Sequence, residues 1–251
     1  MALTLQPRVK DRGSRPRRRS IRPVLFDCLE PRTLLSATWA LRAGGPLGDS
    51  ASKVAVDALG DAYCVGSFRG GADFNGDGVA DLTAAGGADG YVAKYSPDGT
   101  LLWANRLGGT SDDSAKGVAV GPDGSLYVSG NFVGTATFGG QGLTLTSRGS
   151  QDSFAAKLDP ATGQFLWARR MGGMTYGDAK AVAADATGVF VTGSFDGKAD
   201  FGPYTFTGAG ADVFVARLDA SGNFQWARQM GGAMADGPGN ALALDPPATS
   251  S

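Results

Sequence analysis

One short stretch of this chain has the residue types and the spacing of a cation-binding loop. In DFNGDGVADL, at residues 73–82, oxygen-bearing groups recur at alternate positions. The five candidate ligands are the side chains of Asp73, Asn75, Asp77 and Asp81 and the backbone carbonyl of Val79. Hard cations such as Ca²⁺ take about six to eight oxygen ligands, and Gly78 permits the sharp turn that wraps a loop around the ion. The stretch therefore predicts a calcium site.

This loop resembles the nine-residue D-x-(D/N)-x-D-G-x-x-D calcium loops of integrin-type propellers. It departs from an EF-hand, because the twelfth position is Ala84 rather than a bidentate glutamate. We therefore expect weak binding, with a Kd of roughly 10⁻⁴ to 10⁻³ M. The alternative is a solvated Asp/Asn/Gly turn that holds no ion. Asp200 aligns with Asp73 but lacks companions, so it is interpreted as a turn residue.

The residues needed for common catalytic chemistry are missing from the sequence. The chain has no histidine, which excludes serine–histidine triads and histidine zinc sites. Asp112 and Asp113 are adjacent, so in a strand they would point to opposite faces. Beside Gly108 and Gly109 they are better placed to cap a turn. No glycine-rich loop leads into a helix pattern, which argues against phosphate binding. We expect no enzymatic activity.

Charge is distributed unevenly along the chain. Residues 1–36 hold nine Lys/Arg and three acidic residues, whereas the remainder holds fourteen Lys/Arg and twenty-one acidic residues. A basic arm can bind nucleic acid. The acidic body offers no matching basic face, and its aromatic residues fall at repeated positions where a core needs them. We therefore expect no nucleic-acid partner.

No apolar run in the sequence approaches the roughly 18 residues of a membrane span, so we also expect no transmembrane segment.

The positioning elements are repeats. A heptad of the form W-A-x-x-x-G-G occurs four times, beginning at Trp39, Trp103, Trp167 and Trp226. Such a period is typical of repeat architectures. The 40 glycines and the single glutamate, Glu30, favour turns over helices. Each repeat contains four strand-like stretches of the KGVAV, LYVSGNF, SFAAKLD and FLWARRM types, with a longer excursion between the second and the third.

We therefore predict an all-β fold, a β-propeller-type repeat of four-stranded antiparallel blades. Three complete blades are accompanied by partial strands at Trp39 and at residues 240–244, and we expect an incomplete ring. The predicted segments are a leader at 1–37, repeats at 38–109, 110–173 and 174–232, the start of a further blade at 233–245, and a tail at 246–251. The tryptophans are expected to fill the gaps between blades.

The body resembles the bacterial β-propeller repeat family called SBBP. The resemblance rests on D-x-A-x-x-V-A-V-D-x-x-G-x-x-Y-V-x-G-x-F, which is approximated at Asp49–Phe68, Asp113–Phe132 and Asp178–Phe195. Proteins of that family are mostly secreted or surface-exposed, and no general activity is assigned to them. KLDPATGQFLW, at Lys157–Trp167, is similar to the tryptophan-docking motif of quinoprotein propellers, which ties one blade to the next.

The first 37 residues form a separate segment. LEPRTLL, at Leu29–Leu35, follows an arginine cluster and resembles the LEPR-x-LL leader of planctomycete-type surface and secreted repeat proteins. That resemblance implies export or sorting. The apolar stretch at 24–26 is far shorter than that of an ordinary signal peptide. The alternative is a disordered basic tail.

Together these patterns predict a non-catalytic, extracellular or cell-surface propeller, adhesive or structural, with one weak calcium site. Its expected partner is a protein or a glycan. Two alternatives remain open: a lectin-like carbohydrate-binding module, and a fragment of a propeller enzyme such as a lyase or a glycosidase. Open blade faces bearing Trp, Phe and Met favour association. We therefore also expect either self-association or a longer parent protein.

Overall fold

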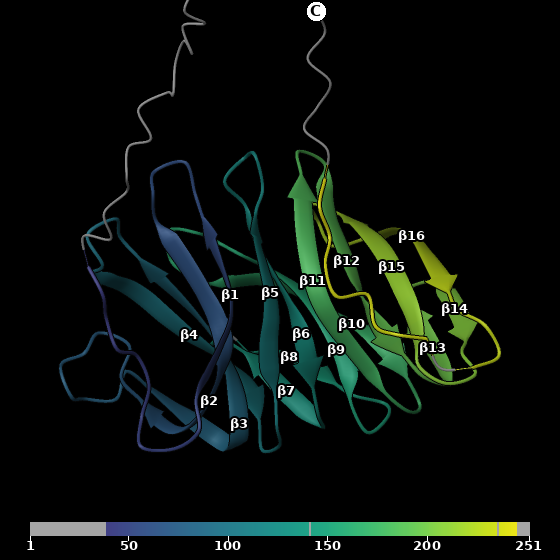
Figure 1. Ribbon diagram of the computed structural model, residues 1–251, viewed down its shortest axis with the longest axis horizontal. Helices are drawn as coiled ribbons and strands as arrows, with labels where there is room; N and C mark the ends of the chain where they lie inside the picture. The colour runs from purple at the N-terminus through teal and green to yellow at the C-terminus, as the bar shows by residue number, and fades with distance from the viewer. Residues whose placement is uncertain (1–38, 141, 235, 245–251) are drawn as a thin grey trace, which may run out of the picture. The chain divides into compact units, whose positions relative to one another are not determined.

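The computed structural model describes residues 39–140, 142–234 and 236–244 (Figure 1). The chain divides into two units, Met1–Ala37 and Thr38–Ser251, and all described residues belong to the second. The predicted leader at 1–37 and the tail at 246–251 thus lie outside the described residues. The described part is formed by strands, without an α-helix, which confirms the all-β prediction. It accordingly holds no helix long and apolar enough to cross a membrane.

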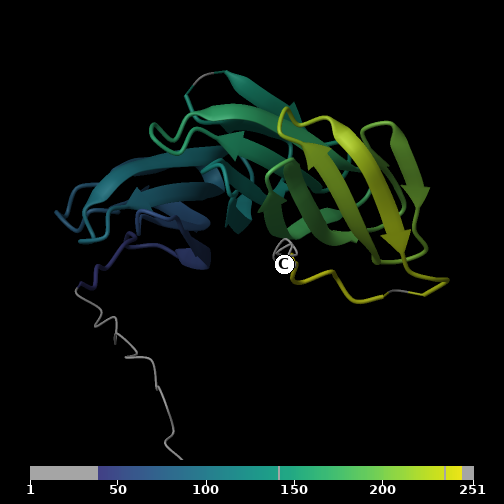
Figure 2. The ribbon, with the colours of Figure 1, turned by 90° about the horizontal axis from the view of Figure 1, so that it is seen from above.

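Twelve strands of the described part form three antiparallel four-stranded blades, which follow one another in Figures 1 and 2. Blade 1 consists of β1 (Ser50–Val56), β2 (Ala62–Ala72), β3 (Leu82–Tyr95) and β4 (Leu101–Gly109). Blade 2 consists of β5 (Ser114–Val120), β6 (Leu126–Phe132), β9 (Asp152–Leu158) and β10 (Phe165–Gly173). Blade 3 consists of β11 (Gly177–Asp185), β12 (Gly188–Phe195), β15 (Asp212–Asp219) and β16 (Phe224–Met230). The propeller-type repeat predicted from the heptads is therefore present.

The excursions of the second and third repeats are β-hairpins, which the sequence did not predict. The hairpin strands are β7 (Thr135–Phe138), β8 (Leu143–Thr146), β13 (Lys198–Phe201) and β14 (Tyr204–Thr207). Strand β7 pairs with β4 of blade 1, and β13 pairs with β10 of blade 2. Each hairpin therefore extends the outer strand of the preceding blade, so backbone hydrogen bonds join consecutive repeats.

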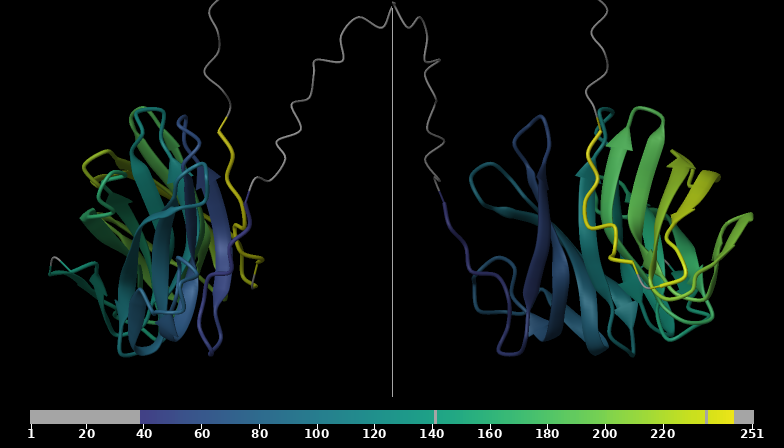
Figure 3. Two further views of the ribbon diagram at one scale, coloured as in Figure 1. Left: turned by 90° about the vertical axis from the view of Figure 1, so that its left-hand side faces the viewer. Right: turned by 45° about the vertical axis from the view of Figure 1, so that its right-hand side comes forward.

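Two of the three apolar clusters of the described part lie between blades; Figure 3 shows the ribbons of these blades from the side. Side chains alternate along a strand, so each blade has two packing faces. Tyr63 and Val65 of β2 lie in one apolar cluster with Phe132 and Phe154 of blade 2. A second cluster joins blades 2 and 3, and includes Trp167. Burial of these faces explains why a single blade requires neighbours.

The repeated tryptophan docks onto the next repeat. Trp39, Trp103 and Trp167 donate their Nε1–H groups to the carbonyls of Pro97, Pro160 and Ala220, at 3.0, 3.2 and 3.0 Å. Each acceptor lies in the turn between the third and fourth strands of the next blade along the chain. A glycine two or three residues further on has a positive φ and leaves room for the indole; these are Gly99, Gly163 and Gly222. The prediction that the tryptophans lie between blades is confirmed for Trp103 and Trp167; Trp226 lies in β16 of blade 3, and the described residues supply no following blade for it.

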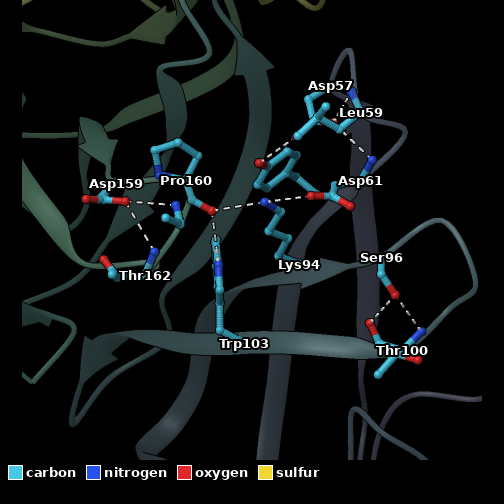
Figure 4. A network of polar contacts seen from close by, with 12 residues as sticks. Asp57, Leu59, Asp61, Lys94, Ser96, Thr100, Trp103, Asp159, Pro160 and Thr162 are labelled. Atoms are coloured by element: carbon cyan, nitrogen blue, oxygen red, sulfur yellow. Dashed lines mark hydrogen bonds and ion pairs between the residues drawn. The ribbon is translucent and has the colours of Figure 1, made fainter.

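Figure 4 shows one dock in detail. The Pro160 carbonyl accepts both Trp103 Nε1–H and Lys94 Nζ–H, each at 3.2 Å. Lys94 also forms an ion pair with Asp61 at 2.8 Å, and both side chains are almost buried. Its ammonium lies 5.1 Å from the centre of the Tyr63 ring. The turn of blade 2 is thus held by an indole and an ammonium from blade 1.

The partial strands predicted at the two ends are wrong in detail. Around Trp39 the structure has only an isolated bridge between Gly44 and Asp73, and residues 240–244 form no strand. A strand needs a ladder of hydrogen bonds with a neighbour. Among the described residues, the segment at 39–45 forms backbone–backbone hydrogen bonds only with Asp73, although the Trp39 side chain reaches Pro97. Local pattern alone therefore did not suffice.

Candidate functional site

The predicted calcium loop, residues 73–81, connects β2 to β3 at the place where the later repeats have their hairpins. Asp73 and Gly44 exchange backbone hydrogen bonds of 2.7 and 3.2 Å. Asp200, at the equivalent position of the third repeat, pairs with Gly172. Asp200 is therefore a strand residue of β13, not the turn residue expected, and its carboxylate forms a 2.7 Å ion pair with Arg148. The loop thus joins residues 39–45 to blade 1.

The carboxylate of Asp73 organises the loop backbone. Its Oδ1 accepts the N–H groups of Asn75 at 3.0 Å and Gly76 at 2.6 Å. Its Oδ2 accepts the N–H of Gly78 at 2.7 Å. The hydrogen bond from Gly78, followed by the others, lowers the pKa of Asp73 below its ordinary value, against a smaller opposing effect of burial. Asp73 thus loses its charge at a lower pH than an ordinary aspartate does.

Three further predicted ligands converge on one another. Asn75 Nδ2 lies 3.2 Å from both Asp77 Oδ2 and Asp81 Oδ1. Asp81 Oδ2 accepts the N–H of Phe74 at 2.6 Å, which closes the loop end to end. The side-chain amide therefore lies between two carboxylates, where it satisfies part of their hydrogen-bonding capacity.

The loop conformation requires its glycines. Gly76 and Gly78 have φ values of 79° and 88°, which residues with a Cβ rarely adopt. The space beside Gly78 is open, so only its backbone angle demands glycine. Val79 donates its N–H to Asp77 Oδ1 at 2.7 Å, and its side chain is 68% exposed. An apolar side chain left in solvent indicates that backbone, not packing, decides the conformation here.

This arrangement brings together Asn75, Asp77 and Asp81, whereas Asp73 acts mainly on backbone N–H groups. Within the described residues, no three His, Cys, Asp or Glu side chains are gathered closely enough to hold a metal ion by themselves. A cation here would need the amide oxygen of Asn75 and the Val79 carbonyl besides carboxylates. In the structure the Asn75 Nδ2 group faces the carboxylates of Asp77 and Asp81. Rotation of the amide by about 180° would place its oxygen there instead.

A second set of acidic residues, absent from the predictions, lies at the blade junctions. Asp89, Asp152 and Asp212 begin or precede the buried part of the third strand in each blade, and each is fully buried. Within the part of the chain that the structure describes, Oδ1 has no hydrogen-bond partner in any of the three. Each Oδ1 instead lies against the first glycine of the Gly-Gly pair in its own blade. The repeated Gly-Gly pair therefore leaves room for a buried carboxylate.

A second aspartate approaches the same glycines from the following repeat. Asp113 accepts the Gly109 N–H at 2.7 Å and the Val133 N–H at 2.9 Å, so it caps the turn as expected. The equivalent residue in the third repeat is Gly177, because Ala179 pairs with Gly193 as Ala115 pairs with Gly130. Asp178, which the SBBP-like pattern aligns with Asp113, therefore lies one residue after the structurally equivalent position. The spacing G-G-x-x-x-D in the sequence could have identified the equivalent aspartates.

Burial has a measurable electrostatic consequence at Asp113. Desolvation, the largest effect, raises the pKa of Asp113 to about 6, although the N–H groups of Val133 and Gly109 act in the opposite direction. The negative charge of Asp89 contributes to the rise. A carboxyl group with a raised pKa thus lies between blades 1 and 2.

A groove at the outer side of the junction between blades 2 and 3 could hold a ligand. Its volume is about 520 Å³. Its lining residues are Arg148, Arg169, Arg170, Asp200, Gly202, Pro203, Gly222, Asn223 and Phe224. The Arg148 side chain is 59% exposed. Three guanidinium groups lie beside an aromatic ring, but Arg148 and Arg170 are paired with Asp200 and Asp152, and Arg169 donates to backbone carbonyls. An anionic ligand here would compete with these partners.

Comparison with known proteins gives limited similarity. No family model matches the chain. It is 31% identical over 156 residues to "Regulatory protein FlaEY" of Caulobacter vibrioides, which covers 59% of this chain and 16% of that protein. It is 30% identical over 112 residues to "Uncharacterized WD repeat-containing protein L264" of Acanthamoeba polyphaga mimivirus, covering 42% of this chain and 8% of that protein. The chain thus spans less than a fifth of either relative, and the second likeness agrees with a propeller-type fold.

Proposed function

We propose that this chain is a non-catalytic β-propeller scaffold that acts outside the cell or at its surface and binds a protein or a glycan. The supporting observation is the tryptophan dock, which recurs at three successive repeats through Trp39, Trp103 and Trp167. The docks assign the most strongly repeated residues to holding blades together. Ligand binding then belongs to residues that differ between repeats, as in other repeat scaffolds with extended binding surfaces.

The loop at 73–81 is proposed to bind one structural Ca²⁺ in this scaffold. The ligands are Asp73, Asn75, Asp77, the Val79 carbonyl and Asp81. The support is the convergence of Asn75, Asp77 and Asp81 and the glycine-dependent turn around them. Such a site would lock the loop that connects residues 39–45 with blade 1.

Hydrogen exchange of the loop amides tests this calcium proposal. Millimolar CaCl₂ should slow exchange across residues 73–81 in the unmodified chain and leave exchange unchanged in Asp77→Ala. Asp123→Ala is the matched control, because Asp123 similarly accepts an exposed turn N–H, from Ser125 at 3.0 Å. The control should keep the full calcium effect. Equal exchange with and without CaCl₂ in the unmodified chain would show that the loop is a solvated turn.

Carbohydrate binding is a second candidate function, favoured by the groove with Arg148, Arg169 and Phe224. Aromatic rings and guanidinium groups together suit an acidic sugar. An array of neutral and acidic glycans tests this directly. Binding to acidic glycans that is lost in Arg148→Ala supports a lectin-like role. Binding that survives this substitution places the ligand elsewhere.

A further inference from the structure

The fourth position of the heptad carries a charge in every repeat except the last. It is arginine at Arg42, Arg106 and Arg170, but glutamine at Gln229. In blades 1 and 2 this arginine forms the ion pair with the buried aspartate. Arg106 Nη1 lies 2.5 Å from Asp89, and Arg170 Nη1 lies 3.0 Å from Asp152. Blade 3 therefore lacks the usual counter-charge.

Asp212 is the buried carboxylate that loses its partner. It is fully buried, and its Oδ2 accepts only an amide N–H, from Gln229 Nε2 at 2.5 Å. Its Oδ1 has no hydrogen-bond partner among residues 39–140, 142–234 and 236–244. None of the ion pairs within the described residues includes it. An uncompensated buried charge is strongly unfavourable, so this site needs a positive charge or a proton.

A second carboxylate lies at the same place. The Asp236 N–H donates to the Ala211 carbonyl at 2.9 Å, which sets Asp236 beside Asp212. Asp236 Oδ2 accepts the Gly232 N–H at 2.8 Å. A Cβ added to Gly231 would collide with Asp212 Oδ1 and lie 2.9 Å from Asp236 Oδ2. The two oxygens therefore face one small space, near enough for a single ion to touch both.

We propose that Asp212 and Asp236 bind a divalent, oxygen-seeking cation of the Ca²⁺ type. Two carboxylates without a basic partner carry a charge of about −2, which one divalent ion neutralises and one proton does not. Asp236 is exposed, so water can reach the ion and complete its coordination. The site is independent of the loop at 73–81 and ties the segment after β16 to β15.

The other junctions explain why the site is confined to blade 3. The first junction has two carboxylates, Asp89 and Asp113, but also Arg106. The second has Asp152 and Arg170, with Gly177 in place of a second carboxylate. Gln229→Arg should therefore abolish cation binding at blade 3, and Arg106→Gln should create it at the first junction.

The test compares thermal unfolding in CaCl₂ with thermal unfolding in NaCl of equal ionic strength. Both measurements use the Asp77→Ala variant, which lacks a ligand of the proposed calcium site in the loop at 73–81. At about 10 mM CaCl₂ the melting temperature should rise by about 3–10 °C, as expected for a Kd of roughly 10⁻⁴ to 10⁻³ M. Gln229→Arg should abolish this rise and increase the melting temperature in chelator. Asp236→Asn, a substitution of an exposed residue, should abolish the rise without that increase.

A gain of binding provides the independent arm. Arg106→Gln leaves Asp89 and Asp113 without an arginine, so it should create a second cation site. The increase in melting temperature that CaCl₂ causes should then be larger than in the parent variant. Arg170→Gln should destabilise the protein without adding such a site, because Gly177 supplies no carboxylate. The proposal is overturned if Asp77→Ala alone shows no calcium response, or if Gln229→Arg retains it.

Discussion

Replacing Gly222 with alanine should destabilise the protein through two separable effects. Gly222 has a φ of 80°, and a Cβ there would lie 2.8 Å from Trp167 Cδ2, inside van der Waals contact. Gly124 offers the matched control, because its φ is 81° and a Cβ there would meet nothing within 4 Å. Gly124→Ala therefore reports the backbone effect alone, and Gly222→Ala adds the collision with the indole.

The magnitudes follow from these two geometries. A left-handed conformation costs an alanine about 1–2 kcal/mol relative to glycine. Forcing an extra carbon against a packed side chain costs about 1–3 kcal/mol more. For a domain of this size, 1 kcal/mol corresponds to about 2–4 °C in melting temperature. We expect Gly124→Ala to lower the melting temperature by a few degrees and Gly222→Ala to lower it by about twice as much.

Circular dichroism and tryptophan fluorescence measure both variants in the same buffer. Fluorescence should also shift for Gly222→Ala, because the Trp167 indole loses its 3.0 Å hydrogen bond to the Ala220 carbonyl. Gly124→Ala should leave the emission spectrum unchanged. Equal destabilisation by the two substitutions would refute the close dock of indole on glycine.

Three further outcomes are expected. Trp103→Phe should lower the free energy of unfolding by at least about 1 kcal/mol in urea titrations, because the hydrogen bond to the Pro160 carbonyl is lost. The pKa of Asp113 is raised to about 6, above its unfolded value, so the stability it contributes is present at low pH and is lost as the pH rises through 6. Asp113→Asn should remove this part of the pH dependence of melting between about pH 4 and pH 7; an unchanged profile would contradict the assignment. Deletion of residues 1–37 should leave the melting curve of the body intact and prevent delivery to the cell surface in a producing cell; an unfolded body would place the boundary elsewhere.

Much of the fold was predictable because each repeat carries its own local pattern. Alternating side chains and Asp/Gly turns define four strands per repeat, and the recurrence of the heptad implies that equal units stack. The five calcium-ligand candidates were visible for the same reason, since they lie within nine consecutive residues. Their convergence on Asn75 was not visible, because side-chain directions in a loop depend on backbone angles that only the folded chain defines.

The hairpins required the tertiary structure. Each of their strands has four residues, too few for a clear alternation, and the partner strand belongs to the preceding repeat. Leu107 pairs with Phe138, and Gly172 with Asp200, so the pairing lies about thirty residues away along the chain. The partial strands failed for the converse reason: the pattern at 240–244 is strand-like, but the described residues supply no neighbour for it.

By itself the sequence determined the repeat, the number of strands in each blade and the residues that dock blade to blade, because these follow from local periodicity. Only the tertiary structure decided which carboxylates are buried and which of them have a counter-charge. In the sequence, nothing distinguishes Asp89, Asp152 and Asp212 from exposed aspartates, and Gln229 is an ordinary polar residue in a strand. The replacement of arginine by Gln229 matters because folding removes Asp212 from water. The carboxylate then loses its solvation, and no positively charged side chain of the described residues compensates for that loss.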